Sequence, residues 1–196
     1  MPANHPPLLL ASSSPARREL LARLGYPFTC RSPDIDESRL PGEDVLSLVR
    51  RLSEAKARAL AEGHPSGLII GSDQALCLDG DILGKPGSHE RAVEQLARLS
   101  GREVTFYTGL CLLNTRSGRC RLTVEPYQVR LRALTADAIN RYLRRDQPYA
   151  CAGSFKAEGL GIALFESFSG RDPTALIGLP LMALVDFLLD EGVEVI

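Results

Sequence analysis

Acidic side chains at the ends of apolar segments are the first candidates for chemistry in this chain. Asp73 stands where the apolar residues 68–71 give way to a polar stretch, at the expected end of a buried strand. A carboxylate held there is partly buried, so it can ligate a metal or act as a general base that activates water. The alternative is an aspartate that caps a turn, which the spacing allows equally.

A second acidic group follows another predicted strand and contains Asp34, Asp36 and Glu37. Paired carboxylates beside a phosphate site commonly hold Mg²⁺, which keeps several waters and takes further oxygens from the substrate. The alternative is an acidic loop that faces solvent, the commoner fate of an isolated acidic run. Acidic groups at the ends of two strands favour the metal interpretation.

The segment 8–18 predicts an anion site, because it reads as a short buried strand that runs into the start of a helix. Ser14 suits the N-cap and Pro15 the first helical position. The free N–H groups of a helix N-terminus attract anions. Arg17 and Arg18 oppose the helix dipole there, unless a multiply charged anion lies beside them. The alternative is a capped helix whose arginines extend into solvent.

Lysine is rare in this chain, which has Lys56, Lys85 and Lys156 beside twenty arginines. A lysine is a compact point charge suited to close phosphate contact, so each one is a candidate. Lys85 lies in a loop between glycine and proline, and Lys156 in a glycine-rich segment that can line a pocket. The alternatives are lysines that face solvent and a glycine-bent strand with its polar residues outward.

Composition excludes several classes of protein. The 196 residues carry a net charge of −1, which gives no general attraction to nucleic acid or membranes. No apolar run is long enough for a membrane span or a signal peptide, and this favours the cytoplasm. The five scattered cysteines indicate reduced thiols, with Cys111 and Cys120 as expected neighbours across a hairpin.

Absent motifs narrow the chemistry further. The three histidines lie in predicted polar ends or turns, and none is placed to partner a serine or a metal. This disfavours a Ser-His-Asp hydrolase and a histidine-ligated zinc enzyme, so a general base is expected to be a carboxylate. The first strand is followed by neither GxGxxG nor GxxxxGK[ST], which argues against dinucleotide-binding and Walker-type proteins.

Hydrophobic periodicity and turn signals predict one α/β domain over residues 1–196, with a mixed and strongly twisted sheet in two lobes. The predicted helices cover residues 15–24, 41–62, 89–99, 136–145 and 179–189. The predicted strands cover residues 8–11, 26–31, 68–71, 75–78, 82–86, 104–115 and 120–131. The strand at residues 68–71 is expected to stop at residues 72–74. Residues 153–166 are expected to be extended.

Taken together, these segments resemble the Maf family of nucleoside-triphosphate pyrophosphatases. The resemblance extends over nearly the whole chain and rests on the order of several blocks, namely LLLASSSPARRELL, SPDIDES, IIGSDQ, LGKP, VTFYTGL and CAGSFKAEGLGI. The blocks GSDQ and GSFKAEG resemble the 7-methyl-GTP pyrophosphatase branch. The dTTP/UTP branch has a different sequence at the second of these blocks.

The resemblance implies a fold like that of inosine-triphosphate pyrophosphatases, with a deep cleft between two lobes. It implies hydrolysis of the α–β phosphoanhydride to a nucleoside monophosphate and pyrophosphate, with Mg²⁺ or Mn²⁺ as cofactor. It also implies a nucleotide as the partner, and a homodimer is plausible on this ground alone.

The resemblance also assigns roles. Asp73 matches the proton acceptor, and Glu37 and Asp73 are expected to hold the metal. The phosphate-binding positions correspond to Ser12, Ser14, Arg17, Arg18, Lys56 and Lys85. The specificity positions correspond to Ala16, Gln74 and Glu158. Members of this branch often carry an aromatic residue at position 16, so either another ring such as Phe155 stacks on the base or base affinity is weaker.

Two other functions remain open at this point. One is the same reaction on dTTP or UTP. The other is a nucleotide-binding regulator of cell division without significant turnover, against which Asp73 argues.

Overall fold

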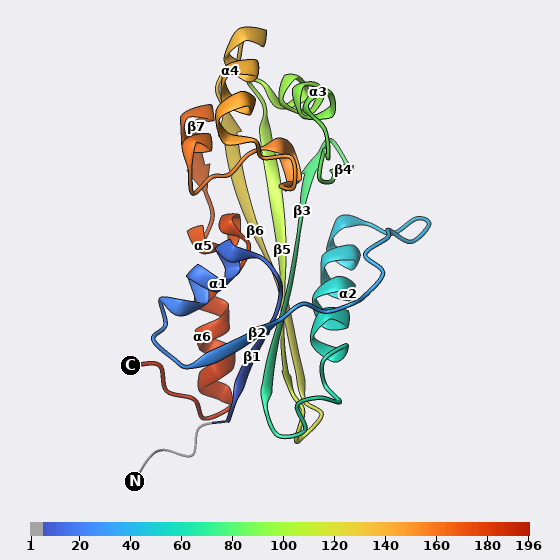
Figure 1. The fold of residues 1–196 in the computed structure, drawn as a ribbon, viewed down its shortest axis with the longest axis vertical. Helices are drawn as coiled ribbons and strands as arrows, with labels where there is room; N and C mark the ends of the chain where they lie inside the picture. Colours follow the sequence, from blue (N-terminus) through green and yellow to red (C-terminus); the bar gives the residue numbers. More distant parts are fainter. Residues whose placement is uncertain (1–5) are drawn as a thin grey trace.

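A long mixed β-sheet runs through the whole molecule and supports all the other elements (Figure 1). The computed structural model describes residues 6–196, and within them seven strands form one sheet in the order β2-β1-β3-β5-β6-β7, with β4 paired to β3. The strands are β1 (Leu8–Ala11), β2 (Phe28–Arg31), β3 (Leu68–Leu78), β4 (Asp81–Leu83), β5 (Glu103–Asn114), β6 (Cys120–Leu131) and β7 (Phe165–Ser169). The expected mixed α/β fold is therefore confirmed.

The short strand β1 lies between two parallel neighbours, β2 and β3. All four of its residues are buried, as expected for a strand covered on both faces. Its side chains alternate between two cores: Leu8 and Leu10 pack on one face of the sheet, and Leu9 and Ala11 on the other.

Strand β3 does not stop at residues 72–74, so that part of the sequence prediction is wrong. It pairs without interruption with β5, including the register Asp73 with Gly109. Polar residues are tolerated inside this strand because neighbouring elements satisfy them: Ser72 donates to the Gly109 carbonyl, and Ser53 accepts from the Asp73 N–H. The polar side chains thus interrupt the apolar pattern without ending the strand.

Helices cover both faces of the sheet (Figure 1). They are α1 (Pro15–Ala22), α2 (Val45–Arg58), α3 (His89–Leu99), α4 (Ala136–Asp146), α5 (Pro173–Ile177) and α6 (Leu181–Asp190). Helices α1 and α6 pack in one core with β1 and β3, whereas α2 packs on the opposite face. The cap residues Ser14, Asp44, Ser88 and Thr135 each accept from a backbone N–H in the first turn.

The second lobe lies at one end of the sheet, where α3, α4 and β7 surround the ends of β3, β5 and β6 (Figure 1). Its core includes Phe106, Phe155 and Phe165, which form edge-to-face contacts. The expected extended conformation of residues 153–166 is wrong. This stretch contains two 3₁₀ turns, η1 (Ala152–Ser154) and η2 (Leu160–Leu164), before β7 begins. Gly153 permits the first turn, because its φ of 75° is left-handed.

Helix boundaries shifted by a few residues from the sequence prediction, as is usual where end turns fray. The largest shift concerns α2, which starts after its cap Asp44 and ends at Arg58. The sequence prediction missed α5, and of β7 it included only Phe165 and Glu166, at the end of the stretch expected to be extended. No helix within residues 6–196 is long and apolar enough to cross a membrane.

Candidate active site

A cleft of about 970 Å³ lies between the two lobes. Most residues predicted from the sequence to act on a nucleotide line this cleft, although they come from six separate segments. They are Ser12, Ser14, Ala16, Arg17, Glu37, Lys56, Asp73, Gln74, Lys85 and Glu158. The fold therefore brings together residues that are up to 146 positions apart in the sequence.

The centre of the cleft is a cluster of two carboxylates around one ammonium group. Lys56 Nζ lies 2.6 Å from Asp73 Oδ1 and 2.8 Å from Glu37 Oε1. Lys56 and Asp73 are only 6% and 9% exposed. A buried charge is tolerated when an opposite charge hydrogen bonds to it, and this pair meets that condition. The cluster therefore fixes the Asp73 carboxylate in a single orientation.

Glu37 links this cluster to the opposite wall of the cleft. Its Oε2 atom lies 3.9 Å from Nζ of Lys85, which is two-thirds exposed. Partial burial raises the pKa of Glu37, but the hydrogen bond from Lys56 and the charges of Lys56, Lys85 and Arg17 outweigh this effect. The pKa of Glu37 is consequently below its ordinary value. Glu37 is thus a carboxylate held in its ionised form.

The loop that carries Lys85 is fixed from the second lobe. Gln95 of α3 donates to the Gly84 carbonyl at 3.1 Å, and the Gly87 N–H donates to the Tyr149 carbonyl at 3.0 Å. Gln95 in turn accepts a 2.6 Å hydrogen bond from the buried Ser154. Ser154 has a φ of 64°, an unusual conformation for a residue other than glycine. Both ends of the Lys85 loop are therefore anchored.

Two glycines allow α2 to approach the sheet closely enough for Lys56 to reach Asp73. A Cβ on Gly71 would lie 2.0 Å from the Ser53 carbonyl oxygen, and one on Gly109 would lie 2.3 Å from the Val49 carbonyl oxygen. Ser53 lies at this contact, where its hydroxyl donates to the Val49 carbonyl and accepts from the Asp73 N–H. The close approach of the α2 backbone to β3 and β5 thus determines how near Lys56 lies to Asp73.

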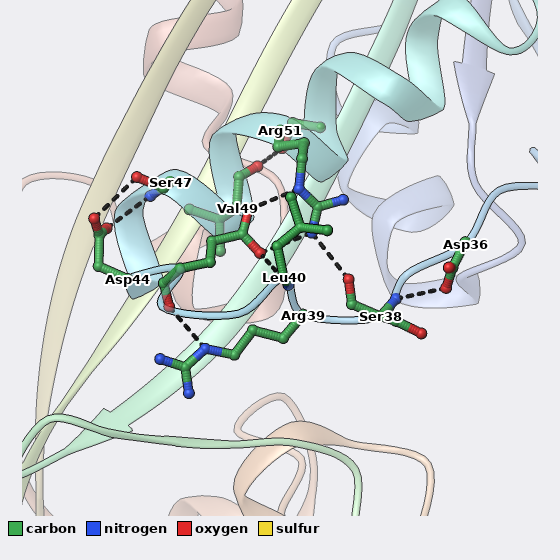
Figure 2. Close-up of polar contacts among 10 residues, drawn as sticks. Asp36, Ser38, Arg39, Leu40, Asp44, Ser47, Val49 and Arg51 are labelled. Carbon is green, nitrogen blue, oxygen red and sulfur yellow. Dashed lines mark hydrogen bonds and ion pairs between the residues drawn. The ribbon is translucent and has the colours of Figure 1, made fainter.

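The loop between β2 and α2 carries Glu37, and polar contacts fold it back onto α2 (Figure 2). Arg51 of α2 binds both carboxylate oxygens of Glu43, at 2.6 and 2.8 Å, and also donates to the Ser38 carbonyl. Ser38 N–H donates to Asp36, so Asp36 shapes the loop and does not join the cluster around Lys56. These contacts hold the segment that follows Glu37 in place.

The start of α1 forms another wall of the cleft. Ser14 N–H donates to the Ser12 hydroxyl, and the Ser14 hydroxyl accepts from the Arg17 N–H. Arg17 Nε donates to the Gly178 carbonyl at 2.7 Å. Burial lowers the pKa of Arg17, while the charges of Asp73 and Glu37 act in the opposite direction. A guanidinium in this setting is well suited to a polyphosphate.

Arg18 is the one predicted site residue that does not line the cleft. It lines a neighbouring groove of about 1200 Å³ between α1 and β2, which shares the residues Ser12–Pro15 with the cleft. Successive helix residues point about 100° apart, so Arg17 and Arg18 face different sides of α1. A phosphate role for Arg18 therefore remains a prediction that the cleft does not support directly.

The predicted specificity residues lie in the same cleft but differ in how far hydrogen bonds hold their side chains. The side-chain nitrogen of Gln74 lies within 3.0 Å of Thr108 Oγ1 and of the Ala175 and Leu176 carbonyls. Carbonyl oxygens only accept, so the amide nitrogen must face them and Gln74 Oε1 is directed away. Glu158 is exposed, and no other described residue hydrogen bonds to its carboxylate.

Phe155, the ring suggested in place of an aromatic residue at position 16, lines the cleft but is mostly buried. It is 5% exposed and packs edge to face between Phe106 and Phe165. Little of its ring is therefore accessible to a base.

The donor atoms fit a metal that arrives with a phosphate ligand. Lys56 engages one oxygen each of Asp73 and Glu37, and the second oxygen of Glu37 lies 3.9 Å from Lys85 Nζ, so an ion at this place would share Glu37 with Lys85. In the described part of the chain, no cluster of three or more His, Cys, Asp or Glu side chains is arranged around a metal position. Mg²⁺ in such a place would complete its shell with phosphate oxygens and water, as it commonly does.

Sequence reasoning missed two contributors to the site, Ser53 and the turn at Gly178. A signal for the second was present, because Asp172-Pro173-Thr174 has the cap and proline typical of a helix start and Gly178 is typical of a helix end. No local signal distinguishes Ser53 from other serines on a helix. The thiols of Cys111 and Cys120 are 3.3 Å apart, which confirms them as neighbours across β5 and β6.

Comparisons with known proteins agree with this geometry. A family model described as Maf-like protein matches residues 7–191. A Pseudomonas fluorescens protein named 7-methyl-GTP pyrophosphatase is 61% identical over 188 residues, which cover 96% of this chain and 98% of that protein. A protein of the same name from Nitrosococcus oceani is 55% identical over 197 residues, covering 100% and 99% of the two chains.

Among solved structures, the Staphylococcus aureus Ham1 protein superimposes with a TM-score of 0.54 at 13% sequence identity. The match covers 94% of this chain and 98% of that chain. At this identity the similarity concerns the fold alone, and it confirms the elongated mixed sheet with two lobes.

Proposed function

Since the chain belongs to the Maf-like protein family, we propose that it hydrolyses 7-methyl-GTP to 7-methyl-GMP and pyrophosphate, in the cytoplasm. The observation that carries the reaction type is the cleft in which Asp73, Glu37, Lys56, Lys85 and Arg17 converge. Relatives at 55–61% identity that bear the name 7-methyl-GTP pyrophosphatase support the choice of substrate.

The cations of the cleft are proposed to bind the triphosphate. Arg17 offers a planar guanidinium suited to two phosphate oxygens, and Lys56 and Lys85 offer point charges on the other walls. Charge builds up on the bridging oxygen and on the leaving pyrophosphate as the α–β bond breaks. Cations fixed in advance at these positions lower the energy of that state.

Asp73 is proposed to orient the attacking water and take its proton. The oxygen of that water bonds to the α-phosphorus while the bond to the β-phosphate oxygen breaks, so pyrophosphate leaves with the electron pair. Asp73 suits this role because Lys56 holds one of its oxygens at 2.6 Å, leaving the other to face a water.

We further propose that the reaction depends on Mg²⁺ or Mn²⁺ held by Glu37 and Asp73 together with phosphate oxygens. A divalent ion at this place supplies charge neutralisation for the phosphates and lowers the pKa of a bound water. Glu37 suits the role because Lys56, Lys85 and Arg17 keep its pKa low and thus keep it ionised.

Recognition of the base is assigned to Glu158 and Gln74. Both residues line the cleft and carry acceptor oxygens, and guanine offers an N–H edge of donors. A carboxylate also favours 7-methylguanine, whose ring is cationic near neutral pH. Ala16 leaves space at this wall in place of a ring.

The test is a substrate panel in which released pyrophosphate is measured with and without Mg²⁺ or Mn²⁺. We expect the highest kcat/KM for 7-methyl-GTP, against GTP, dTTP and UTP, and activity only with metal. A preference for dTTP or UTP would assign the chain to the other branch of the family. Nucleotide binding without hydrolysis under all conditions would instead indicate a regulator.

A further inference from the structure

The turn between α5 and α6 reaches the wall of the cleft through the backbone carbonyl of Gly178. The Gly178 carbonyl accepts from Arg17 Nε at 2.7 Å and lies 2.9 Å from the Ser72 hydroxyl, whose one proton is shared between the Gly178 and Gly109 carbonyls. Ser72 directly precedes Asp73 on β3. One backbone oxygen therefore joins the arginine of the α1 wall to the strand that carries the candidate general base.

This turn is itself firmly held. Asp172, 1% exposed, accepts from the Thr174 N–H and hydroxyl and from the Met182 N–H, so it joins the start of α5 to the start of α6. Gly178 has a φ of 121°, which other residues rarely adopt. A Cβ at Gly178 would lie 3.3 Å from Arg17 Nε. The backbone conformation thus favours glycine, and any larger residue would also displace the Arg17 side chain by a few tenths of an ångström.

We propose that the α5–α6 turn orients Arg17 toward the polyphosphate and that Gly178 is a positioning residue for it. A guanidinium is planar, so a hydrogen bond at Nε fixes its plane and leaves the two terminal nitrogens for a ligand. No other described residue accepts from those nitrogens. The inference rests on the proposed function in that it takes Arg17 to bind substrate phosphate.

The chemistry of the acceptor supports this role. A carboxylate at the place of the Gly178 carbonyl would orient Arg17 but would also neutralise its charge. A neutral carbonyl orients the guanidinium and leaves its full charge for the phosphate. The partner of Arg17 Nε at this turn is therefore an uncharged backbone carbonyl, and its Coulomb partners Asp73 and Glu37 belong to the cleft.

The experiment measures binding of inorganic tripolyphosphate by calorimetry, in the presence of Mg²⁺, to the full chain and its variants. Gly178→Ala and Arg17→Ala are each expected to raise the Kd about tenfold, the loss of one charge-assisted interaction. In the double variant, Gly178→Ala is expected to add nothing, because its effect acts through Arg17. Gly192→Ala is the matched control, since Gly192 also has a positive φ but a Cβ there would meet nothing within 4 Å.

Three outcomes would overturn the inference: an unchanged Kd in Gly178→Ala, the same tenfold loss from Gly178→Ala in the Arg17→Ala background, or no binding of tripolyphosphate by the unaltered chain. If Gly178→Ala fails to fold, Arg17→Lys replaces it, because lysine keeps the charge but has no Nε donor. The same tenfold loss is then expected, and wild-type affinity would refute the proposal.

A hydrolysis assay separates this inference from the proposed function. Gly178→Ala should raise KM for 7-methyl-GTP more than it lowers kcat, since Arg17 is assigned to binding. If the unaltered chain hydrolyses no nucleotide but the tripolyphosphate cycle behaves as expected, the proposed function fails and the positioning role stands. If the unaltered chain hydrolyses 7-methyl-GTP normally but the effects of Gly178→Ala and Arg17→Ala on tripolyphosphate binding add up in the double variant, the proposed function stands and the positioning role of Gly178 fails.

Discussion

The charged residues in the cleft differ in burial, and this difference assigns their tasks. Lys56 and Asp73 are buried and bound to each other, whereas Lys85 is largely exposed and Glu37 lies between these extremes. The lining also includes Arg17, Glu19, Lys156 and Glu158, so four cations face four carboxylates and the cleft carries no net formal charge. Attraction for a polyphosphate therefore depends on where the cations lie and not on an excess of positive charge.

Asp73→Asn tests the central assignment at the residue scale. We expect kcat to fall by about 10²–10⁴-fold, the usual contribution of a general base. Nucleotide binding should survive, because the asparagine oxygen can still accept from Lys56. Pyrophosphate release and calorimetry measure the two properties. Asp81→Asn is the control, since Asp81 is an exposed carboxylate paired with Arg98 away from the cleft. Full activity in Asp73→Asn would refute the role.

Glu158→Gln tests recognition of the base. The neutral amide keeps the size of the side chain but removes the charge that favours a cationic ring. We expect the ratio of kcat/KM for 7-methyl-GTP to that for GTP to fall by about tenfold, in line with loss of one charge-assisted contact. An unchanged ratio, with both substrates turned over normally, would contradict the assignment of Glu158.

At the scale of elements, the contact between α2 and the sheet controls where Lys56 lies. In Gly71→Ala, the new Cβ would meet the Ser53 carbonyl, so the helix must move outward. We expect a loss of about 1–3 kcal/mol in the free energy of unfolding, as for other overpacked cores. Urea unfolding measures this loss. Gly84→Ala, where a Cβ meets nothing within 4 Å, should change stability by less than about 0.5 kcal/mol.

The loop that carries Glu37 gives stability a dependence on pH. The hydrogen bonds from Arg51 lower the pKa of Glu43 from 4.5 to about 2. A carboxyl with a lowered pKa stabilises the fold fully above 4.5, and this contribution is lost as the pH falls from 4.5 to about 2. Glu43→Gln should therefore be less stable than the unaltered chain at pH 7, and the two should converge near pH 2. Urea unfolding across this range measures the difference, and parallel curves would refute the prediction.

How much of the fold followed from the sequence depended on whether the signal was local. The caps Ser14 and Thr135 and the hairpin between β5 and β6 were predicted correctly, because cap chemistry and turn residues are read within a few positions. Residues 153–166 were wrong because Gly153 adopts its turn against Leu76 and Phe155, contacts that only the folded lobe provides.

Prediction of the site likewise succeeded for some residues and failed for others. Its charged residues were found because the family resemblance and their rarity marked them. Their partners were not found: Ser53 and the Gly178 turn act through hydrogen bonds across 20 and 161 positions of sequence. A pattern in one sequence carries no information on which distant backbone atom will meet a given side chain.

At the scale of the whole molecule, a ligand in the cleft contacts both lobes and should stabilise them together. With Asp73→Asn to prevent turnover, 7-methyl-GTP at about 100 times its Kd should add about 2.7 kcal/mol to the free energy of unfolding. For a chain of this size the Tm should rise by about 5–10 °C. Calorimetric unfolding measures the shift. Guanosine is the control, because it lacks the phosphates and should have a much smaller effect.

The strands β3 and β5 connect the two lobes and limit how the cleft between them can change shape when a ligand binds. They contain 11 and 12 residues, hydrogen bonded to each other along ten consecutive register pairs, and they pass from one lobe into the other. The lobes are therefore joined by a stiff spine about 35 Å long, without a flexible hinge. The Glu37 and Lys85 loops are also held, by hydrogen bonds to α2 and to the second lobe, so a nucleotide is expected to enter and leave a cleft whose walls keep a fixed separation.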